Sequence, residues 1–242
     1  MTINVAVTGA TGRMGRVIVD LIESTDELAL HAALDSSSSL DEMVGADVLI
    51  DVTNLEFSER AVSFALAHGL NVVVGTSGWN ADRLTELEGE IPADRGVLVV
   101  PNFSVGSVLS THLAAIAGRF FDSIEVIEAH HDRKIDSPSG TAVRTAEAIA
   151  AARDTALEPP FADQTARGEV VAGIPVHSMR LRGVVADQQV ILGGVGEVVT
   201  IRHETLSPGA YSHGIELALR QSPDLRGLTV GLDALLGLES GR

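Results

Sequence analysis

A short strand, a glycine-rich turn and an amphipathic helix open the chain, and this unit constrains the fold more than any other stretch. Ile3–Val7 is a largely β-branched run of the kind that forms a buried strand. Glycines at positions 9, 12 and 15 follow it, and apolar residues recur at helical spacing through Arg13–Ile22. Such a turn carries a helix N-terminus to the end of a strand, where it can bind a pyrophosphate. The unit therefore predicts a βαβ fold with a nucleotide site at its first turn.

Strands and helices alternate as far as Pro101, which predicts an α/β domain with a doubly wound parallel sheet. The further strands are expected over Leu28–Leu34, Val48–Val52, Asn71–Val74 and Val97–Val100, and the helices over Ser58–His68 and Ala81–Glu90.

The pattern changes after Pro101 and predicts a second, α+β part with antiparallel or mixed strand pairing. Its helices are expected over Val105–Phe120 and Thr141–Arg153, a long loop over Glu158–Gly173, and strands over Ile124–Ala129, His177–Leu181, Val190–Leu192 and Val198–His203. A helix over Ala210–Arg220 and an apolar tail over Leu228–Leu238 complete the chain, and pattern alone does not assign the tail to either part.

Composition narrows the classes of function. The 242 residues are 45% hydrophobic and 21% charged, which suits a globular core. The formal net charge of −16 disfavours binding to nucleic acid or to an anionic membrane surface. No cysteine is present, so disulfides, thiolate nucleophiles and cysteine-based zinc sites are excluded. With no visible secretory signal and no apolar run of membrane-spanning length, the expected location is cytoplasmic.

Three features beyond the glycine turn point to a dinucleotide. Asp35 ends the second predicted strand about 20 residues after Gly15, where a carboxylate can bind a ribose. An acid there favours NADH over NADPH, although Arg13 and Arg16 nearby could soften that preference. The loops G-T-S-G and P-N-F follow two further strands, at the sheet edge where such folds bind ligands. Each feature alone is compatible with a ligand-free turn; together they predict a nucleotide crevice.

The stretch E-A-H-H-D-R-K-I-D-S-P-S-G-T-A concentrates proton-carrying groups before a helix. His130 and His131 end a predicted strand and can titrate near neutral pH, as general acids must. Lys134 adds a positive charge. Pro138 suits the first turn of the helix, and free N–H groups over residues 139–141 are expected to form an anion pocket. These features predict a carboxylate-binding site with its own proton donors.

Two other interpretations remain open for this stretch. The histidines can be hydrogen-bonded structural residues beside an ordinary helix cap. A metal site formed with His203 is the third possibility, but adjacent histidines point to opposite faces of a strand and no acid has suitable spacing. No metal is therefore expected.

At these residues the chain resembles the dihydrodipicolinate reductase family, now called 4-hydroxy-tetrahydrodipicolinate reductase. The resemblance covers essentially the whole chain, including G-A-T-G-R-M-G-R, P-N-F-S-V-G and G-I-P-V-H-S-M-R-L-R-G. The glycine turn is common among nucleotide-binding proteins, whereas H-H-x-x-K-x-D-x-P-S-G-T-A is highly specific.

The resemblance implies a function, a fold and a set of site residues. It implies NAD(P)H-dependent reduction of 4-hydroxy-tetrahydrodipicolinate or dihydrodipicolinate to tetrahydrodipicolinate in the diaminopimelate route to lysine. It also implies a Rossmann domain over residues 1–104 and 214–242, and a substrate-binding and tetramerisation domain over residues 105–213. His130 and Lys134 match the proton donors, and His131, Lys134, Ser139, Gly140 and Thr141 match the contacts to the substrate's carboxylate. The cofactor contacts match Gly9, Ala10, Thr11, Gly12, Arg13, Met14, Asp35, Gly75, Thr76, Ser77, Val100, Pro101, Asn102 and Phe103.

The chain departs from the family pattern at a few positions. Ser137 replaces an alanine, Ser77 a threonine, and Val52 a frequent phenylalanine, while the loop at Ser207 and Pro208 is shorter and lacks an arginine. These changes leave the predicted chemistry intact and put the geometry of that loop in doubt. Two alternatives remain: another NAD(P)-dependent dehydrogenase of amino-acid metabolism, and a non-enzymatic NAD(H) sensor.

Overall fold

The computed structural model describes residues 2–238, which form two compact units. Residues 2–105 and 208–238 make up the first unit, and residues 106–207 the second. The chain thus leaves the first unit once and returns to it.

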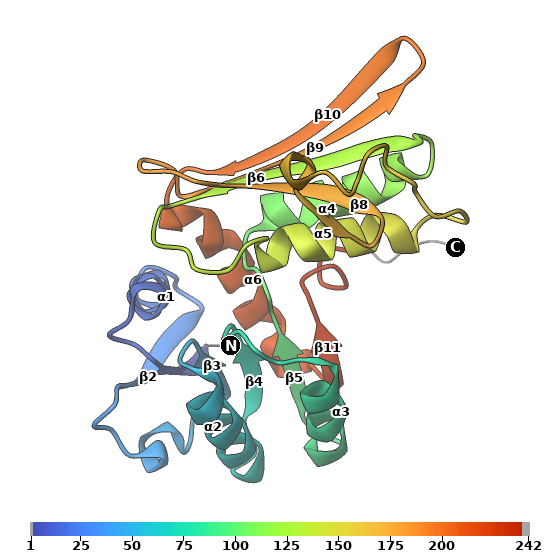
Figure 1. Cartoon of the computed structure of the whole chain (residues 1–242). Helices are drawn as coiled ribbons and strands as arrows, with labels where there is room; N and C mark the ends of the chain where they lie inside the picture. Colours follow the sequence, from blue (N-terminus) through green and yellow to red (C-terminus); the bar gives the residue numbers. More distant parts are fainter. Residues whose placement is uncertain (1, 239–242) are drawn as a thin grey trace. The chain divides into compact units, whose positions relative to one another are not determined.

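The first unit is built on a six-stranded sheet in the order β11-β5-β4-β3-β1-β2, and every neighbouring pair is parallel. Because the chain moves from β1 out to β2 and then back to β3 on the other side of β1, the switch point lies between β1 and β3 (Figure 1). The strands are β1 (Ile3–Thr8), β2 (Leu28–Leu34), β3 (Val48–Asp51), β4 (Asn71–Val74), β5 (Gly96–Val99) and β11 (Gly227–Val230).

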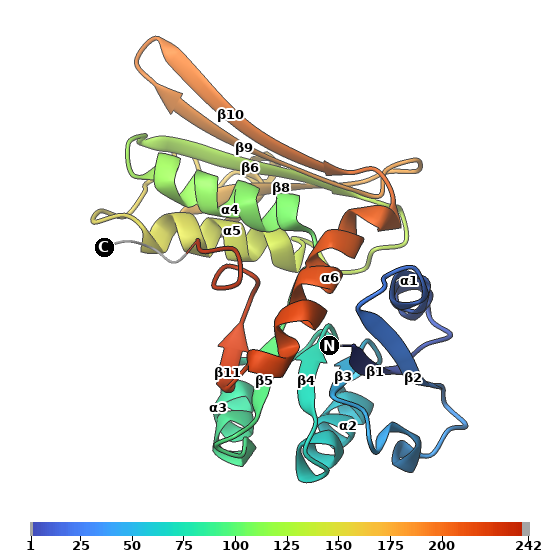
Figure 2. The same ribbon diagram turned by 180° about the vertical axis from the view of Figure 1, so that it is seen from behind.

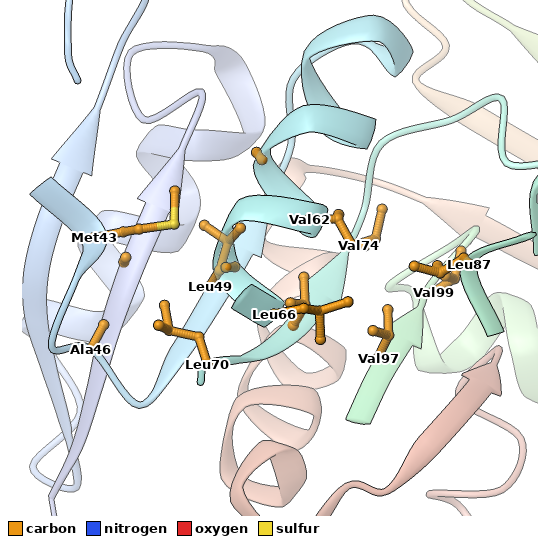
Figure 3. Close-up of a cluster of buried hydrophobic side chains, with 14 of the residues drawn as sticks. Met43, Ala46, Leu49, Val62, Leu66, Leu70, Val74, Leu87, Val97 and Val99 are labelled. Carbon is orange, nitrogen blue, oxygen red and sulfur yellow. The ribbon is translucent and has the colours of Figure 1, made fainter. Parts of the chain in front are cut away.

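One face of this sheet is covered by α2 (Leu55–Ala67) and α3 (Ala81–Glu90). Figure 3 shows Leu66 of α2 among strand valines that include Val74 and Val97, with Leu87 of α3 beside them. Val72, Val74, Val97 and Val99 alternate with residues of the opposite face, as strand geometry requires. The strands are apolar on both faces, which is typical of a parallel sheet buried between helices.

The other face carries α1 (Arg13–Glu23) and α6 (Ser212–Gln221), which contact each other. Figure 2 shows α6 on the side of the sheet opposite to α2 and α3. After α6 the chain enters β11, which pairs in parallel with β5. The apolar tail predicted over Leu228–Leu238 therefore belongs to the first unit, and its first three residues lie in the sheet.

The second unit contains a mixed five-stranded sheet in the order β10-β9-β6-β8-β7. Only β6 and β8 pair in parallel; the other three pairs are antiparallel. Two helices, α4 (Val105–Gly118) and α5 (Gly140–Ala151), lie on one face of it (Figures 1 and 2). The strands are β6 (Ser123–His130), β7 (Glu169–Val171), β8 (Ile174–Arg180), β9 (Ala186–Gly194) and β10 (Glu197–Thr205).

The core of the second unit lies between this sheet and its two helices. Ile124 and Val126 of β6 pack with Ala146 and Ile149 of α5 in one buried cluster. The residues of β6 that alternate with these two, such as Glu125, therefore face away from the helices. The predicted fold class, a doubly wound parallel sheet followed by an α+β part, is confirmed.

The predicted loop over Glu158–Gly173 is wrong in its last part, because β7 lies there and forms a hairpin with β8. The turn is made by Ala172 and Gly173, both with positive φ (49° and 83°). Two such residues match the turn that joins two-residue hairpins, where asparagine or aspartate usually precedes the glycine. Alanine at this position hid the turn, and the exposure of Glu169 and Val170 hid the strand.

Helix α2 begins at Leu55, three residues earlier than the predicted Ser58. The Asn54 side chain caps it by accepting a hydrogen bond from the N–H of Phe57 at 3.2 Å. The signal was present, because asparagine is a preferred N-cap residue. The other helices and strands differ from the predicted bounds at their ends by three residues or fewer on each side in most cases, as for α1 and α5.

Gly15, in the first turn of α1, lies against the loop that precedes this helix. A Cβ at this position would lie 2.1 Å from the carbonyl oxygen of Gly9 and 2.7 Å from the Cα of Ala10. The absence of a side chain therefore lets the first turn of α1 close onto the loop that precedes it.

We expect Gly15→Ala to destabilise the first unit, because backbone atoms cannot move aside for the added methyl group. Overpacking of this kind should lower the free energy of unfolding by roughly 2–3 kcal/mol, and the melting temperature by roughly 5–10 °C. Gly89→Ala is the matched control: it is also a helical glycine, and nothing lies within 4 Å of its added Cβ. Thermal unfolding followed by circular dichroism measures both; equal melting temperatures would contradict the assigned role of Gly15.

Candidate active site

The loops predicted to contact a cofactor all lie at one edge of the first sheet. Because the strands are parallel, the segments that follow β1, β2, β4 and β5 emerge at the same carboxyl-terminal edge. These segments hold all fourteen predicted cofactor residues: Gly9–Met14, Asp35, Gly75–Ser77 and Val100–Phe103.

The first turn has the backbone of an anion-binding loop. Gly9 has a φ of 78°, and a Cβ there would lie 2.7 Å from the carbonyl oxygen of Val52. Gly12 is the N-cap of α1 and supplies no side-chain hydrogen bond. In contrast, α2, α3 and α5 are each capped by an asparagine or serine side chain. The first N–H groups of α1 thus have no side-chain cap among the described residues, so a phosphate oxygen can bind there.

Asp35 follows β2 directly and is held in a tight turn. Its Oδ1 accepts hydrogen bonds from the Ser37 hydroxyl at 2.7 Å and the Ser37 N–H at 2.8 Å. These bonds lower the pKa of Asp35, the side-chain bond having the larger effect. Hydrogen bonds from Ser38 lower this pKa further. The carboxylate is therefore held by the turn after β2, at a position where a carboxylate can accept a ribose hydroxyl.

A buried carboxyl group at the switch point was missed by sequence reasoning. Asp51 ends β3 and accepts hydrogen bonds from the hydroxyls of Thr8 at 2.7 Å, Thr53 at 2.6 Å and Thr76 at 2.6 Å. Thr76 also accepts a bond from the Thr53 N–H at 2.8 Å. Asp51 therefore ties together the end of β1 and the segments after β3 and β4. The available signal was an acid at the end of the apolar strand V-L-I-D.

Gly75 and Phe103, both predicted cofactor contacts, pack against each other. A Cβ on Gly75 would lie 2.6 Å from the Phe103 ring and 3.0 Å from Val52. The Phe103 side chain belongs to the core, since the residue is 4% exposed. A contact of Phe103 with a cofactor would therefore use its backbone. The smaller Val52, in place of the family's phenylalanine, leaves room for this packing.

The predicted proton donors and substrate contacts gather in the second unit. His130 is the last residue of β6, His131 and Lys134 lie in the connection that follows, and residues 139–141 begin α5. The predicted catalytic and substrate-binding residues therefore occupy one strand end and one helix start.

Glu128, which was not predicted as a site residue, is the centre of this segment. It is 0% exposed, and each of its two carboxylate oxygens accepts two hydrogen bonds. Oε2 accepts from His130 Nδ1 at 2.6 Å and Arg180 Nη1 at 2.9 Å, and Oε1 from Arg180 Nη2 at 3.0 Å and the Ser139 N–H at 3.1 Å. Burial alone would raise the pKa of Glu128, but the bonds from His130 and Arg180 outweigh it and lower that pKa to about 2.

The start of α5 differs from prediction in two respects. Pro138 precedes the N-cap residue Ser139 and does not lie in the first turn. The Ser139 N–H is not free for a substrate, because it donates to Glu128. The Ser139 hydroxyl accepts from the Ala142 N–H at 3.2 Å. Of the three predicted N–H donors, Gly140 and Thr141 keep theirs without a partner among the described residues.

Lys134 and His131 have different surroundings. Lys134 Nζ lies 2.8 Å from Oδ1 of Asp136, and the hydrogen bond from Lys134 holds the pKa of that carboxyl below its usual range. His131 Nδ1 is buried and has no hydrogen-bond partner among the described residues. A buried polar atom of this kind is costly unless a ligand or water satisfies it.

The described residues contain no group of three or more histidines or acids placed to hold a metal ion. Within residues 2–238, no helix is both long and apolar enough to span a membrane.

Comparison with known proteins extends over the whole chain. Residues 3–103 match the family described as dihydrodipicolinate reductase, N-terminus, and residues 106–236 match dihydrodipicolinate reductase, C-terminus. The 4-hydroxy-tetrahydrodipicolinate reductase of Clavibacter sepedonicus is 55% identical over 246 aligned residues, covering 100% of this chain and 89% of the relative. The enzyme of that name from Cutibacterium acnes is 44% identical, with 98% and 100% covered.

A solved structure shows the same architecture. Dipicolinate-bound dihydrodipicolinate reductase from Paenisporosarcina sp. TG-14 has a TM-score of 0.85 and 30% identity, covering 97% of this chain and 99% of that chain. The fold, the nucleotide-binding edge and these matches define the class: the chain is an NAD(P)H-dependent oxidoreductase. It belongs to the dihydrodipicolinate reductase family, as its sequence motifs predict.

The low pKa of Glu128 predicts a specific acid sensitivity. The pKa falls from its ordinary 4.5 to about 2 in the folded chain, so the stabilisation is complete above pH 4.5 and is lost as the pH falls toward 2. This shift of the pKa corresponds to roughly 3 kcal/mol in the free energy of unfolding. We expect Glu128→Gln to unfold more easily than the wild type near pH 6, and the difference to shrink steadily below pH 4.5. Urea denaturation between pH 7 and pH 3 measures it; a constant difference across that range would contradict the prediction.

Proposed function

We propose that this chain reduces 4-hydroxy-tetrahydrodipicolinate, or its dehydrated form, to tetrahydrodipicolinate with NAD(P)H in lysine biosynthesis. The observation that carries the proposal is the folded H-H-x-x-K-x-D-x-P-S-G-T-A block, in which histidine, lysine and helix N–H groups share one loop. The full-length match to relatives bearing the reductase's name supports it. Residues 1–104 and 214–242 are proposed as the cofactor domain, and residues 105–213 as the substrate domain.

The first unit would hold the cofactor. The N–H groups at the start of α1 would bind the pyrophosphate, and Asp35 would accept a ribose hydroxyl. A carboxylate at that place favours NADH, since it repels the 2′-phosphate of NADPH. The loops after β4 and β5, Gly75–Ser77 and Val100–Phe103, would contact the nicotinamide end. The bound cofactor supplies a hydride to the substrate.

The second unit would hold the substrate, a cyclic imine or α,β-unsaturated dicarboxylate. The N–H groups of Gly140 and Thr141 point from a helix start and suit a carboxylate. Lys134 adds a positive charge, and the unpaired Nδ1 of His131 offers a further polar contact. Binding at these groups would fix the ring, which lowers the entropic part of the barrier.

His130 or Lys134 would supply the proton. Reduction leaves negative charge on the conjugated imine or enamine, and a neighbouring acid neutralises it. The His130 Nδ1 is engaged by Glu128, so Nε2 is the atom that can face the substrate. Lys134 Nζ pairs with Asp136 at one oxygen, which leaves further N–H donors of the ammonium group for the substrate.

We also propose a homotetramer located in the cytoplasm. The face of the second sheet that α4 and α5 do not cover carries exposed apolar side chains, among them Val198 of β10 and Met179 of β8, which are 66% and 48% exposed. Association with further copies of the chain would bury them.

Both proton donors should be essential to turnover. We expect His130→Ala and Lys134→Ala each to lower kcat by at least about a hundredfold, the scale of a lost general acid, while NADH still binds. His177→Ala is the matched control, because His177 pairs with Glu125 at another place in the same sheet. Near-wild-type turnover in both variants would refute the assignment of these residues.

The assay follows NADH absorbance with the condensation product of pyruvate and aspartate semialdehyde, made in situ. Activity with this compound and none with homoserine or simple 2-keto acids separates the proposed reaction from that of other dehydrogenases. Binding of NADH without any turnover would favour a sensor.

Asp35 should determine the preference between the two cofactors. We expect Asp35→Ala to weaken NADH binding about tenfold, the loss of a hydrogen bond to a charged group, and NADPH binding much less. Asp26→Ala is the control, since Asp26 precedes β2 at the opposite edge of the sheet. Fluorescence titration gives the dissociation constants; equal losses for NADH and NADPH would remove Asp35 from the ribose.

A further inference from the structure

Two similar sets of an acid, a histidine and an arginine start from β6. Glu128 contacts His130 and Arg180, and Glu125 contacts His177 and Arg167. The two acids are three residues apart in a strand, so they point to opposite faces of the sheet. Glu128 shares the parity of the core residue Val126 and is 0% exposed, whereas the Glu125 side chain is 32% exposed.

The buried set determines which nitrogen of His130 carries hydrogen. An ionised carboxylate can only accept hydrogen bonds, so His130 Nδ1, 2.6 Å from Oε2, must donate. The neutral imidazole is thereby restricted to the form with hydrogen on Nδ1, and Nε2 is left to gain and lose the proton. Arg180 holds the carboxylate in place through both of its amino groups.

We infer that Glu128, held by Arg180, is a positioning residue: it fixes the His130 tautomer and keeps Nε2 as the proton-carrying atom during reduction. The inference rests on the proposed role of His130. It extends that role to Glu128 and Arg180, which the sequence analysis did not assign to the site.

Other charged groups near His130 are already paired. On β9, Asp187 lies beside Ala186, the register partner of His130, and binds Arg202. In the connection after β6, Asp132 binds Arg182, and Lys134 binds Asp136. The first turn of α5 contains no acid. Glu128 is thus the carboxylate in direct contact with the imidazole, and the low pKa of Glu128 keeps it charged at neutral pH.

Glu128→Gln is the decisive variant because it reverses the hydrogen bond to His130 with little change in shape, although it also removes the bond from Arg180 Nη1 to Oε2. The amide oxygen is expected to remain with the Ser139 N–H and Arg180 Nη2, since a backbone donor cannot turn away. The amide N–H₂ then replaces Oε2 and donates to His130 Nδ1. His130 can accept only by moving its hydrogen to Nε2, so the substitution inverts the tautomer.

Nitrogen-15 NMR of labelled protein reads this tautomer directly. The His130 signals are assigned among the eight histidines by their loss in His130→Ala. We expect hydrogen on Nδ1 in the neutral imidazole of the wild type and on Nε2 in Glu128→Gln. The wild-type spectrum alone is a test if the variant does not fold: hydrogen on Nε2 there overturns the inference.

The pH dependence of kcat connects the tautomer to turnover. A carboxylate partner stabilises a positively charged imidazole and an amide partner does not, so Glu128→Gln should move the alkaline decline of kcat to lower pH. We expect kcat to fall about tenfold or more while KM changes little. Glu125→Gln, the matched control on the same strand, should leave the tautomer and the pH profile unchanged.

The outcomes separate this inference from the proposed function. An unchanged tautomer in Glu128→Gln, or an equal shift of the pH profile in Glu125→Gln, overturns the inference. Inversion of the tautomer with an unchanged pH profile of kcat also overturns the inference, because the contact would then have no role in turnover. If His130→Ala itself keeps near-wild-type turnover, the assignment of His130 has failed and not the contact between Glu128 and His130.

Discussion

The buried charge of Glu128 determines the shape of the segment that follows β6. A carboxylate with no exposed surface is tolerated only when its lone pairs are satisfied, because isolated charges are strongly disfavoured inside a protein. The donors come from three places in the chain: His130 at the strand end, Arg180 and Ser178 on β8, and the Ser139 N–H at the start of α5. One charge therefore fixes the two ends of a connection whose middle residues are largely exposed.

The first unit organises its site around a second buried acid, with neutral partners in place of an arginine. Asp51 accepts from three threonine hydroxyls, and these belong to the end of β1 and the segments after β3 and β4. The switch point of a doubly wound sheet is where such folds bind ligands. The side chains that fix the loops there are thus paired with each other, and the N–H groups at the start of α1, which have no side-chain cap, are left for an anion.

Much of the fold could be predicted, because strand and helix periods are local properties of the sequence. The alternating pattern predicted most strands of the first unit within one residue, and the glycine turn identified its nucleotide edge. The strand β7 escaped because its residues are exposed and its turn uses alanine. Asn54 was a recognisable cap that the helical pattern alone did not reveal.

The contacts between side chains of the site could not be predicted in the same way. Glu128 and Arg180 are 52 positions apart, so their contact depends on the pairing of β6 with β8. Strand parity was the available clue: Ile124 and Val126 are core residues, and Glu128 continues their series. The prediction of a free N–H group at Ser139 was wrong for the same reason, because this N–H donates to the carboxylate of Glu128, which was not predicted as a site residue.

The net negative charge of the chain does not prevent binding of an anionic substrate, because two different kinds of ion pair lie near the substrate segment. In the Glu128–Arg180 pair the carboxylate is fully buried, and each of its oxygens accepts a hydrogen bond from the guanidinium group. Breaking this pair would leave an unpaired charge in the interior. The Lys134–Asp136 pair includes an aspartate side chain that is 57% exposed, and exposed ion pairs contribute little. A substrate carboxylate can therefore replace Asp136 at Lys134 at small cost, while the buried pair keeps the geometry. For the proposed function, this division between a fixed and an exchangeable ion pair would let one short segment hold its shape and still accept a dicarboxylate.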